Sequence, residues 1–137
     1  MHDGHGSSNN AYWSRYWQQI RLCNQFLENI DNAAVHSETE RARFKAEAHV
    51  LRAYFYSELI KWFGKLPIVD KTIEFDADFS TLRREKVYDV VKFIASDCEA
   101  AISCNELPWR ITTDDEAMRA TKALAWAIDV VCSQSFI

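Results

Sequence analysis

Residues 46–69 read AEAHVLRAYFYSELIKWFGKLPIV, and this stretch decides the fold of the chain. Apolar side chains in and beside it recur at three and four residues and so cover one face of a helix and both its flanks: Phe44, Ala48, Leu51, Phe55, Leu59 and Trp62 on the face, with Val50, Ala53, Tyr54 and Ile60 on the flanks. A helix that is apolar most of the way round lies inside a helical array. We therefore predict an all-α fold with this helix at its centre.

Arg52 interrupts this apolar helix. It shares a face with Ala48, Phe55 and Leu59. An unpaired buried charge is strongly destabilising, and a guanidinium is the cation best suited to a planar, hydrogen-bonded partner. We predict that a carboxylate or backbone carbonyl groups from another element pair with Arg52.

Local signals mark both ends of the helix. Ser37 followed by Glu40 is a capping-box sequence, so we expect the helix to begin near Glu38. Gly64 can adopt the left-handed conformation that closes a helix, and Pro67 prevents its resumption. The helix is therefore expected to stop immediately before the glycine.

Composition favours a single helical unit. The chain has 137 residues, of which 48% are hydrophobic, enough for one sizeable core. Only 3 glycines and 2 prolines are present, too few for a turn-rich β-sandwich or barrel. We expect a flexible polar leader at residues 1–9 and one helical domain at residues 10–137. The net charge of -4 provides no basic field, so nucleic-acid binding is not expected.

Three further helices are expected, which makes about four main helices in all. The first covers about residues 10–30, the third covers about residues 83–103, and the fourth follows a second capping-box sequence at Thr113 and Glu116. Pairing first with second and third with fourth gives the antiparallel hairpins of an α-solenoid, and the sequence agrees only loosely with the tetratricopeptide consensus. The fourth helix has no stop signal before the last residue, which suggests a polypeptide cut short of a natural boundary.

The connection at residues 65–81 is long for a compact domain. Its first part, Leu66-Pro67-Ile68-Val69, is apolar, so we expect it to lie against neighbouring helices. The acidic residues that follow lack the glycine and the closing glutamate of an EF-hand, and we expect a solvated loop rather than a calcium site: Asp70, Glu74, Asp76 and Asp78.

The sequence carries no recognisable catalytic or metal-binding pattern. The four cysteines, at positions 23, 98, 104 and 132, show no C-x-x-C pairing and no histidine at ligand spacing, so no metal is expected. Cys23 and Cys98 read as small buried hydrophobes, although spacing alone leaves open a bridge from Cys98 or Cys104 to another helix. Glu47 and Glu58 are roughly 16 Å apart by helix rise, too far for shared glycosidic chemistry. We expect no cofactor and no enzymatic activity.

Several separated segments resemble one family in the same order, the SusD/RagB family of outer-membrane nutrient-binding lipoproteins. The segment from Ala46 to Pro67 is similar to the family signature E-A-x-x-L-R-A-x-x-Y followed by F-G-x-x-P. The first helix looks like the family's W-x-x-x-Y-x-x-I-x-x-x-N helix, through Trp13, Tyr16, Ile20, Cys23, Asn24, Leu27 and Ile30. Later segments resemble its V-Y-D, D-L-x-x-A, L-P and R-x-T-K landmarks: residues 84–89, 97–101, 107–108 and 119–122.

The resemblance implies a helical, tetratricopeptide-like scaffold, lipid-anchored outside the outer membrane of a Gram-negative bacterium. Such proteins are not enzymes; they bind glycans or other nutrients and act as a lid on a SusC-like, TonB-dependent transporter. Family chains are several times longer, so residues 10–137 would form the N-terminal part of such a protein. This sequence shows no signal peptide, lipid-modified cysteine or membrane-spanning run, so membrane contact is expected only through an anchor that the chain lacks.

The resemblance also assigns candidate ligand-binding residues. The segment that enters the first helix can contribute to the family's ligand face, which here indicates Asn9, Asn10, Tyr12 and Trp13, with Trp109 as a further candidate. Aromatic faces stack on sugars and amides hydrogen-bond the hydroxyls. The alternative is structural: Trp13 belongs to the core, and Asn9 or Asn10 caps the helix. The other tryptophans are expected to be packing residues: Trp17, Trp62 and Trp126.

A second hypothesis is a stand-alone helical-repeat adaptor whose exposed groove binds a peptide or protein partner. Helical hairpins without catalytic residues are compatible with both hypotheses. An open concave surface in an intact protein of this length would favour the adaptor. A longer reading frame beside a transporter would favour the nutrient-binding protein.

Overall fold

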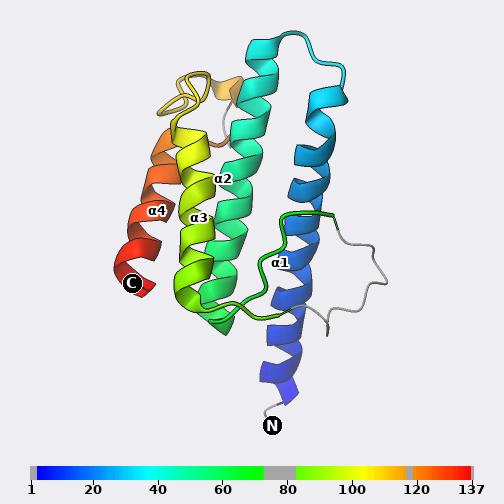
Figure 1. The fold of residues 1–137 in the computed structure, drawn as a ribbon, viewed down its shortest axis with the longest axis vertical. Helices are drawn as coiled ribbons and strands as arrows, with labels where there is room; N and C mark the ends of the chain where they lie inside the picture. The colour runs from blue at the N-terminus through cyan, green and yellow to red at the C-terminus, as the bar shows by residue number, and fades with distance from the viewer. Residues whose placement is uncertain (1–2, 73–82, 117–118, 137) are drawn as a thin grey trace.

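The computed structural model describes residues 3–72, 83–116 and 119–136. Within these ranges the chain forms four α-helices and two short 3-10 turns: α1 (Asp3–Asn29), η1 (Ile30–Asn32), α2 (Glu38–Phe63), α3 (Val87–Ile102), η3 (Asp114–Glu116) and α4 (Lys122–Phe136). Helices α1 and α2 form one antiparallel hairpin, and α3 and α4 form a second (Figure 1). Helix α2 packs against each of the other three helices. This arrangement confirms the expected all-α, tetratricopeptide-like fold.

Both ends of α2 are formed as the sequence predicts. The Ser37 hydroxyl accepts a hydrogen bond from the Glu40 backbone amide at 3.1 Å. The Glu40 carboxylate accepts a hydrogen bond from the His36 backbone amide at 2.9 Å. Gly64 has a φ of 70°, and its amide donates to the Ile60 carbonyl oxygen at 3.1 Å. No neighbouring atom lies within 4 Å of where a Cβ would stand. The glycine is therefore required by its backbone conformation and not by close packing.

The hydrophobic core surrounds α2. Its most enclosed side chains come from all four helices and from the segments beside them: Ile20, Val50, Ala53, Tyr56, Leu59, Ile60, Leu66, Val90, Val91, Ile94, Cys98, Ala101, Leu107, Ala125 and Cys132. Helix α3 contributes a buried stripe that includes Val90, Val91, Ile94, Cys98 and Ala101. The molecule is therefore built around a central helix, as the apolar pattern of α2 predicts.

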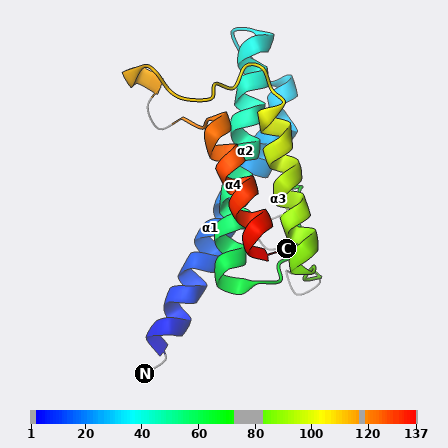
Figure 2. The same cartoon turned by 90° about the vertical axis from the view of Figure 1, so that its left-hand side faces the viewer.

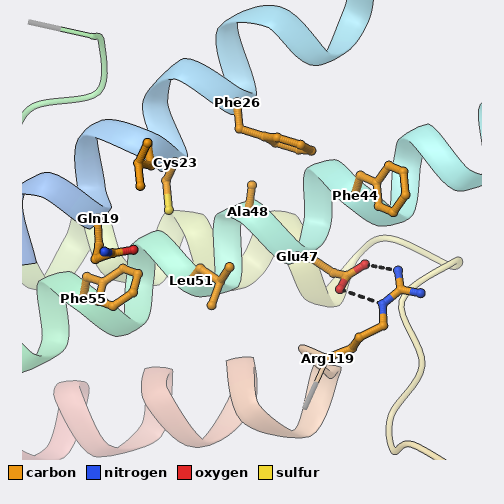
Figure 3. A pocket seen from close by; sticks show the side chains of 10 residues that line it. Gln19, Cys23, Phe26, Phe44, Glu47, Ala48, Leu51, Phe55 and Arg119 are labelled. Atoms are coloured by element: carbon orange, nitrogen blue, oxygen red, sulfur yellow. Dashed lines mark hydrogen bonds and ion pairs between the residues drawn. The ribbon is translucent and has the colours of Figure 1, made fainter. Parts of the chain in front are cut away.

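Four residues expected to be buried or packed are exposed. Leu51, Tyr54 and Trp62, placed by periodicity on the apolar face and flank of α2, are 43%, 38% and 55% exposed, and Trp126 on α4 is 57% exposed. Helices α1 and α4 flank α2 but leave a strip of its surface uncovered (Figure 3). The apolar pattern alone does not distinguish this strip from the core.

A buried polar cluster ties three helices together. Both carboxylate oxygens of Asp97 on α3 accept hydrogen bonds from the guanidinium of Arg52 on α2, at 2.7 and 2.8 Å. Arg52 also donates to Asn24 Oδ1 on α1 at 2.9 Å, and the His49 ring lies 2.7 Å from Asp97. Although burial opposes the charged form, the bonds to Asp97 raise the pKa of Arg52 overall. The prediction of a carboxylate partner from another element is confirmed.

The segment that follows α2 lies against the helices, as its apolar residues predict. Leu66 and Val69 are buried. The Tyr56 hydroxyl accepts the Val69 amide at 2.7 Å. The Asn24 side-chain amide donates to the carbonyl oxygens of Val69 and Lys71, at 3.0 and 3.2 Å. The buried asparagine thus joins the Arg52 cluster to this segment.

Two helix starts differ from expectation. Helix α1 begins at Asp3, earlier than the predicted start at about residue 10. Helix α3 begins at Val87, later than predicted, because the chain first pairs with the segment after α2. There the Glu85 amide donates to the Leu66 carbonyl oxygen at 2.8 Å.

The prediction of a capping box before α4, at residues 113–116, is wrong. The Glu116 carboxylate accepts a hydrogen bond from Arg43 on α2 at 2.8 Å, and this part of the chain forms η3 instead. At the start of α4 the Thr121 hydroxyl accepts the Leu124 amide at 3.2 Å. An ion pair between distant segments therefore overrides a local helix signal.

The four cysteines are free thiols. Cys23 and Cys98 are buried, as expected of small hydrophobes, and so is Cys132. Cys104 is half-buried and donates to the Ala42 carbonyl oxygen at 3.5 Å. The bridge left open by the sequence is not formed.

Candidate functional site

An apolar groove of about 480 Å³ opens over α2. Helix α2 forms its floor, α1 forms one wall, and Arg119, shortly before α4, closes the other side (Figure 3). The lining residues are Gln19, Leu22, Cys23, Phe26, Phe44, Glu47, Ala48, Leu51, Phe55 and Arg119. Leu22, Phe26 and Leu51 each expose two fifths or more of their surface. A concave surface with this lining is typical of a binding site.

A pair of opposite charges stands at one end of the groove. The Arg119 guanidinium donates to both carboxylate oxygens of Glu47, with the Nε to Oε2 distance at 3.1 Å (Figure 3). The hydrogen bond to Glu47 raises the pKa of Arg119, so the guanidinium stays charged. Arg43 and Glu116 extend the cluster towards the segment before α4. Together with Gln19, which also lines the groove, these are the polar groups that could hydrogen-bond a ligand there.

An aromatic ledge, which we define as Tyr12, Tyr16 and Trp62, lies at the opposite end. The Tyr12 ring is nearly parallel to the rings of Trp62 and Tyr16, with centroids 5.4 and 6.2 Å away. Tyr16 in turn contacts Phe55, a lining residue of the groove, at 6.1 Å. The ledge and the groove therefore form one continuous surface. Tyr12 and Trp62 are 36% and 55% exposed, and exposed rings suit the C–H faces of a sugar.

The structure brings only part of the predicted site together. Tyr12 belongs to the ledge. Trp13 is half-buried against Trp17 and Phe63, with the Arg84 guanidinium 5.7 Å from its ring centre. These contacts support the packing alternative for Trp13.

The other sequence candidates lie elsewhere. Asn9 and Asn10 lie inside α1, well after its first residue, so the helix-cap alternative for them is wrong. Trp109 is 54% exposed and has the Lys122 ammonium 5.8 Å from its ring centre. It belongs to the segment between α3 and η3, at the end of the bundle opposite the N-terminal half of α1 (Figure 1). A single small ligand could not contact both Trp109 and the ledge.

The sequence reasoning missed Trp62, Tyr16 and the charged pair as site residues. Tyr12 and Tyr16 stand four residues apart on one helix, a spacing that places both rings on one side. This spacing could have identified Tyr16 as a partner of Tyr12 from the sequence alone. The pairing with Trp62 depends on how α1 crosses α2, and the sequence does not encode this locally.

The described residues contain no cluster of histidine, cysteine and acidic side chains suited to a metal ion. Of the acidic residues considered for calcium, Asp70 is exposed, and Glu74, Asp76 and Asp78 fall outside the described ranges. Among the helices seen here, none combines the length and the apolar character needed to cross a membrane.

Known proteins share this architecture. A SusD-like family model, described as starch-binding associating with outer membrane, matches residues 3–129. A search of curated proteins finds no match. A SusD-like protein from Bacteroides fragilis gives a TM-score of 0.80 at 30% identity, over 91% of this chain and 23% of its own.

Two further solved structures name a ligand class. A SusD-like carbohydrate binding protein from Bacteroides fragilis gives a TM-score of 0.78 at 28% identity, over 88% of this chain and 23% of its own. A laminarin binding SusD-like protein gives a TM-score of 0.79 at 26% identity, over 90% of this chain and 26% of its own. The chain spans about a quarter of the length of each of these structures. With a family match across almost its whole length, this chain belongs to the SusD-like family.

Proposed function

We propose that this chain is part of a non-enzymatic, glycan-binding component of an outer-membrane nutrient uptake system. The observation that carries the proposal is the aromatic ledge, which opens onto a groove in a chain whose structural neighbours include carbohydrate- and laminarin-binding proteins. Stacked tyrosine and tryptophan rings offer apolar faces to pyranose C–H groups.

Hydrogen-bonding groups would complete such a site. Asn9 and Asn10 lie within a turn of Tyr12 on α1, and their amides are the proposed partners of the sugar hydroxyls. Gln19 lines the groove and supplies a further amide. Trp13 and Trp109 stay secondary candidates, because the first is packed and the second lies at the other end of the bundle.

The chain also fits a place in a larger assembly. We infer that it forms the N-terminal part of a longer SusD-like protein, which a lipid anchor holds at the cell surface beside a SusC-like, TonB-dependent transporter. The support is that the chain spans about a quarter of its structural neighbours. Reading the coding sequence on both sides tests this: a lipobox upstream, a long extension downstream and an adjacent transporter gene are expected.

Calorimetric titration tests the ligand class. Titration of the protein with β-glucan and α-glucan oligosaccharides is expected to give binding that Tyr12→Ala or Trp62→Ala abolishes. Tyr88→Ala, which removes an exposed tyrosine on α3 outside the groove and the ledge, is the control and should keep affinity. Saccharide binding that survives both ledge variants would place the site elsewhere.

The adaptor hypothesis makes the opposite prediction. The apolar groove is its support, because an apolar helix or strand of a peptide would fit such a lining. Binding of apolar peptides, blocked by Leu51→Lys and unaffected by saccharides, would replace the nutrient-binding proposal.

A further inference from the structure

The ledge and the groove form one surface, but they suit different chemistry. Tyr16 of the ledge contacts Phe55, which lines the near end of the groove, with ring centroids 6.1 Å apart. Beyond Phe55 the lining is apolar for most of its length: Leu22, Cys23, Phe26, Phe44, Ala48 and Leu51. Helices α1 and α2, whose hairpin Figure 2 shows from the side, supply all of these residues. A ligand that lies on both regions must therefore change in polarity along its length.

The apolar stretch of the groove offers almost nothing to a sugar. Among the lining side chains that the structure describes, only Gln19, Glu47 and Arg119 carry oxygen or nitrogen atoms for hydrogen bonds. Glu47 and Arg119 already bond each other at the far end. The Cys23 thiol is uncharged, because burial raises its pKa to about 11. Saccharide hydroxyls placed along this stretch would lose water without gaining partners, which costs free energy.

The shape of the groove suits an extended chain. The lining positions of α2 recur at three and four residues from Phe44 to Phe55, a distance of about 16 Å by helix rise. Spread over that length, the volume of about 480 Å³ gives a mean cross-section of about 30 Å². The small side chains of Cys23 and Ala48 leave room in the middle (Figure 3). An alkyl or acyl chain fills such a space without needing hydrogen bonds.

We propose that the ligand is an amphiphilic glycoconjugate, with its saccharide on the aromatic ledge and an apolar chain in the groove. This inference rests on the proposed function and adds the class of molecule that the site selects. Gln19 lies beside Phe55 at the junction of the two regions, where its amide is placed to bond the oxygen that links sugar and chain (Figure 3). The ion pair of Arg119 and Glu47 ends the apolar stretch and so limits the length of the chain.

Calorimetric titration of the full chain with alkyl glucosides of increasing length tests the proposal. Both anomers are used, below the concentrations at which they form micelles. Affinity should rise about two- to fourfold per methylene group, because an open groove removes each group from water only in part. The rise should stop once the chain reaches Arg119 and Glu47.

Two matched ligands separate the contributions of sugar and chain. Methyl glucoside keeps the sugar and lacks the chain, whereas an octyl oligo(ethylene glycol) ether keeps the chain and lacks the sugar. Each should bind at least about tenfold more weakly than octyl glucoside, since several buried methylene groups or the sugar contact are lost.

Variants assign the two parts of the ligand to the two regions. Ala48→Leu fills the middle of the groove and should make octyl and methyl glucosides bind alike. Leu51→Asn, at an exposed position of the lining, should reduce the same difference without demanding repacking. Ala100→Leu, on the exposed surface of α3, is the matched control and should keep the full dependence on chain length. Trp62→Ala should weaken glucosides of every length by a similar factor. Circular dichroism checks that each variant is folded.

The outcomes distinguish this inference from the proposed function. Saccharide binding at the ledge with no gain from an alkyl chain would overturn the inference and leave the proposed function intact. Octyl ether that binds as tightly as octyl glucoside, with no loss in Trp62→Ala, would overturn both, because no sugar is then recognised. Apolar peptides that bind the groove while alkyl glucosides do not would overturn the inference in favour of the adaptor.

Discussion

Two clusters join an arginine to a carboxylate from another segment, and they do so in opposite surroundings. Arg52 and Asp97 have side chains that are 8% and 2% exposed, whereas those of Arg119 and Glu47 are 32% and 15% exposed. The buried pair links three helices through Asn24. The partly exposed pair borders the groove. The difference teaches that similar ion pairs have different roles: the first fixes the helices, and the second can be rearranged by a ligand.

Removal of the buried carboxylate of Asp97 tests the difference between the two pairs most sharply. Asp97→Ala leaves the Arg52 guanidinium buried without its partner, and we expect a loss of about 3–5 kcal/mol in the free energy of unfolding. Urea denaturation followed by circular dichroism measures it. Glu99→Gln, an exposed carboxylate two residues along α3, is the matched control and should change stability by no more than about 0.5 kcal/mol.

A double variant tells whether the loss comes from an uncompensated charge. Arg52→Met with Asp97→Leu removes both charges and should be clearly more stable than Asp97→Ala. A double variant as unstable as the single one would mean that the polar cluster itself, through Asn24 and the segment after α2, holds the fold.

A smaller loss is expected at Tyr56. Its hydroxyl accepts the buried Val69 amide at 2.7 Å, and burial raises the pKa of this phenol. Tyr56→Phe leaves that amide without a partner, so the free energy of unfolding should fall by about 1–3 kcal/mol. Tyr54→Phe is the control, because Tyr54 is 38% exposed on the same helix. Equal effects of the two substitutions would show that the hydroxyl does not anchor the segment.

The partly exposed pair, Arg119 and Glu47, should contribute far less to stability. Arg119→Gln is expected to reduce the free energy of unfolding by at most about 1 kcal/mol, since solvent screens a partly exposed ion pair. The same urea titration at low and high salt measures it, and the difference from wild type should shrink as salt rises. A loss as large as that of Asp97→Ala would make the groove wall part of the structural core.

The smallest effect concerns pH. Thr72 donates to Glu28 from its backbone amide and its hydroxyl, at 2.6 and 2.8 Å, and these bonds lower the pKa of Glu28. Glu28 therefore favours the folded state above its ordinary pKa, and that contribution is lost as pH falls through the lowered value. The protection factor of the Thr72 amide against hydrogen exchange should fall as the pH drops below the ordinary pKa of a glutamate and through the lowered value. Glu28→Gln should remove this acid dependence, and an unchanged profile would contradict the assignment.

Local signals predicted the architecture well and the surface poorly. The bounds of α2 follow from Ser37 and Gly64, because a cap and a left-handed turn act within a few residues. A carboxylate partner for Arg52 was predictable, but its identity was not, since Asp97 is distant in sequence.

The candidate site shows where sequence reasoning stops. Tyr12 was found through a family resemblance, whereas Trp62 was assigned to packing because exposed and buried apolar residues share one periodicity on α2. Which of these apolar residues is exposed to solvent depends on the distance between α1 and α4, which is a tertiary property. The start of α4 was missed for a similar reason, because the Glu116 carboxylate accepts a hydrogen bond from Arg43 instead of capping a helix.

Burial of the cysteines determines how the protein can be labelled. Burial raises the pKa of Cys23 to about 11 and that of Cys98 to about 12, and it also raises the pKa of Cys132. Thiolates are the reactive form, so these three sulfurs should resist maleimides near neutral pH. A fluorophore could then be placed on an engineered cysteine beside the ledge, with Cys104 as the single native position to replace first.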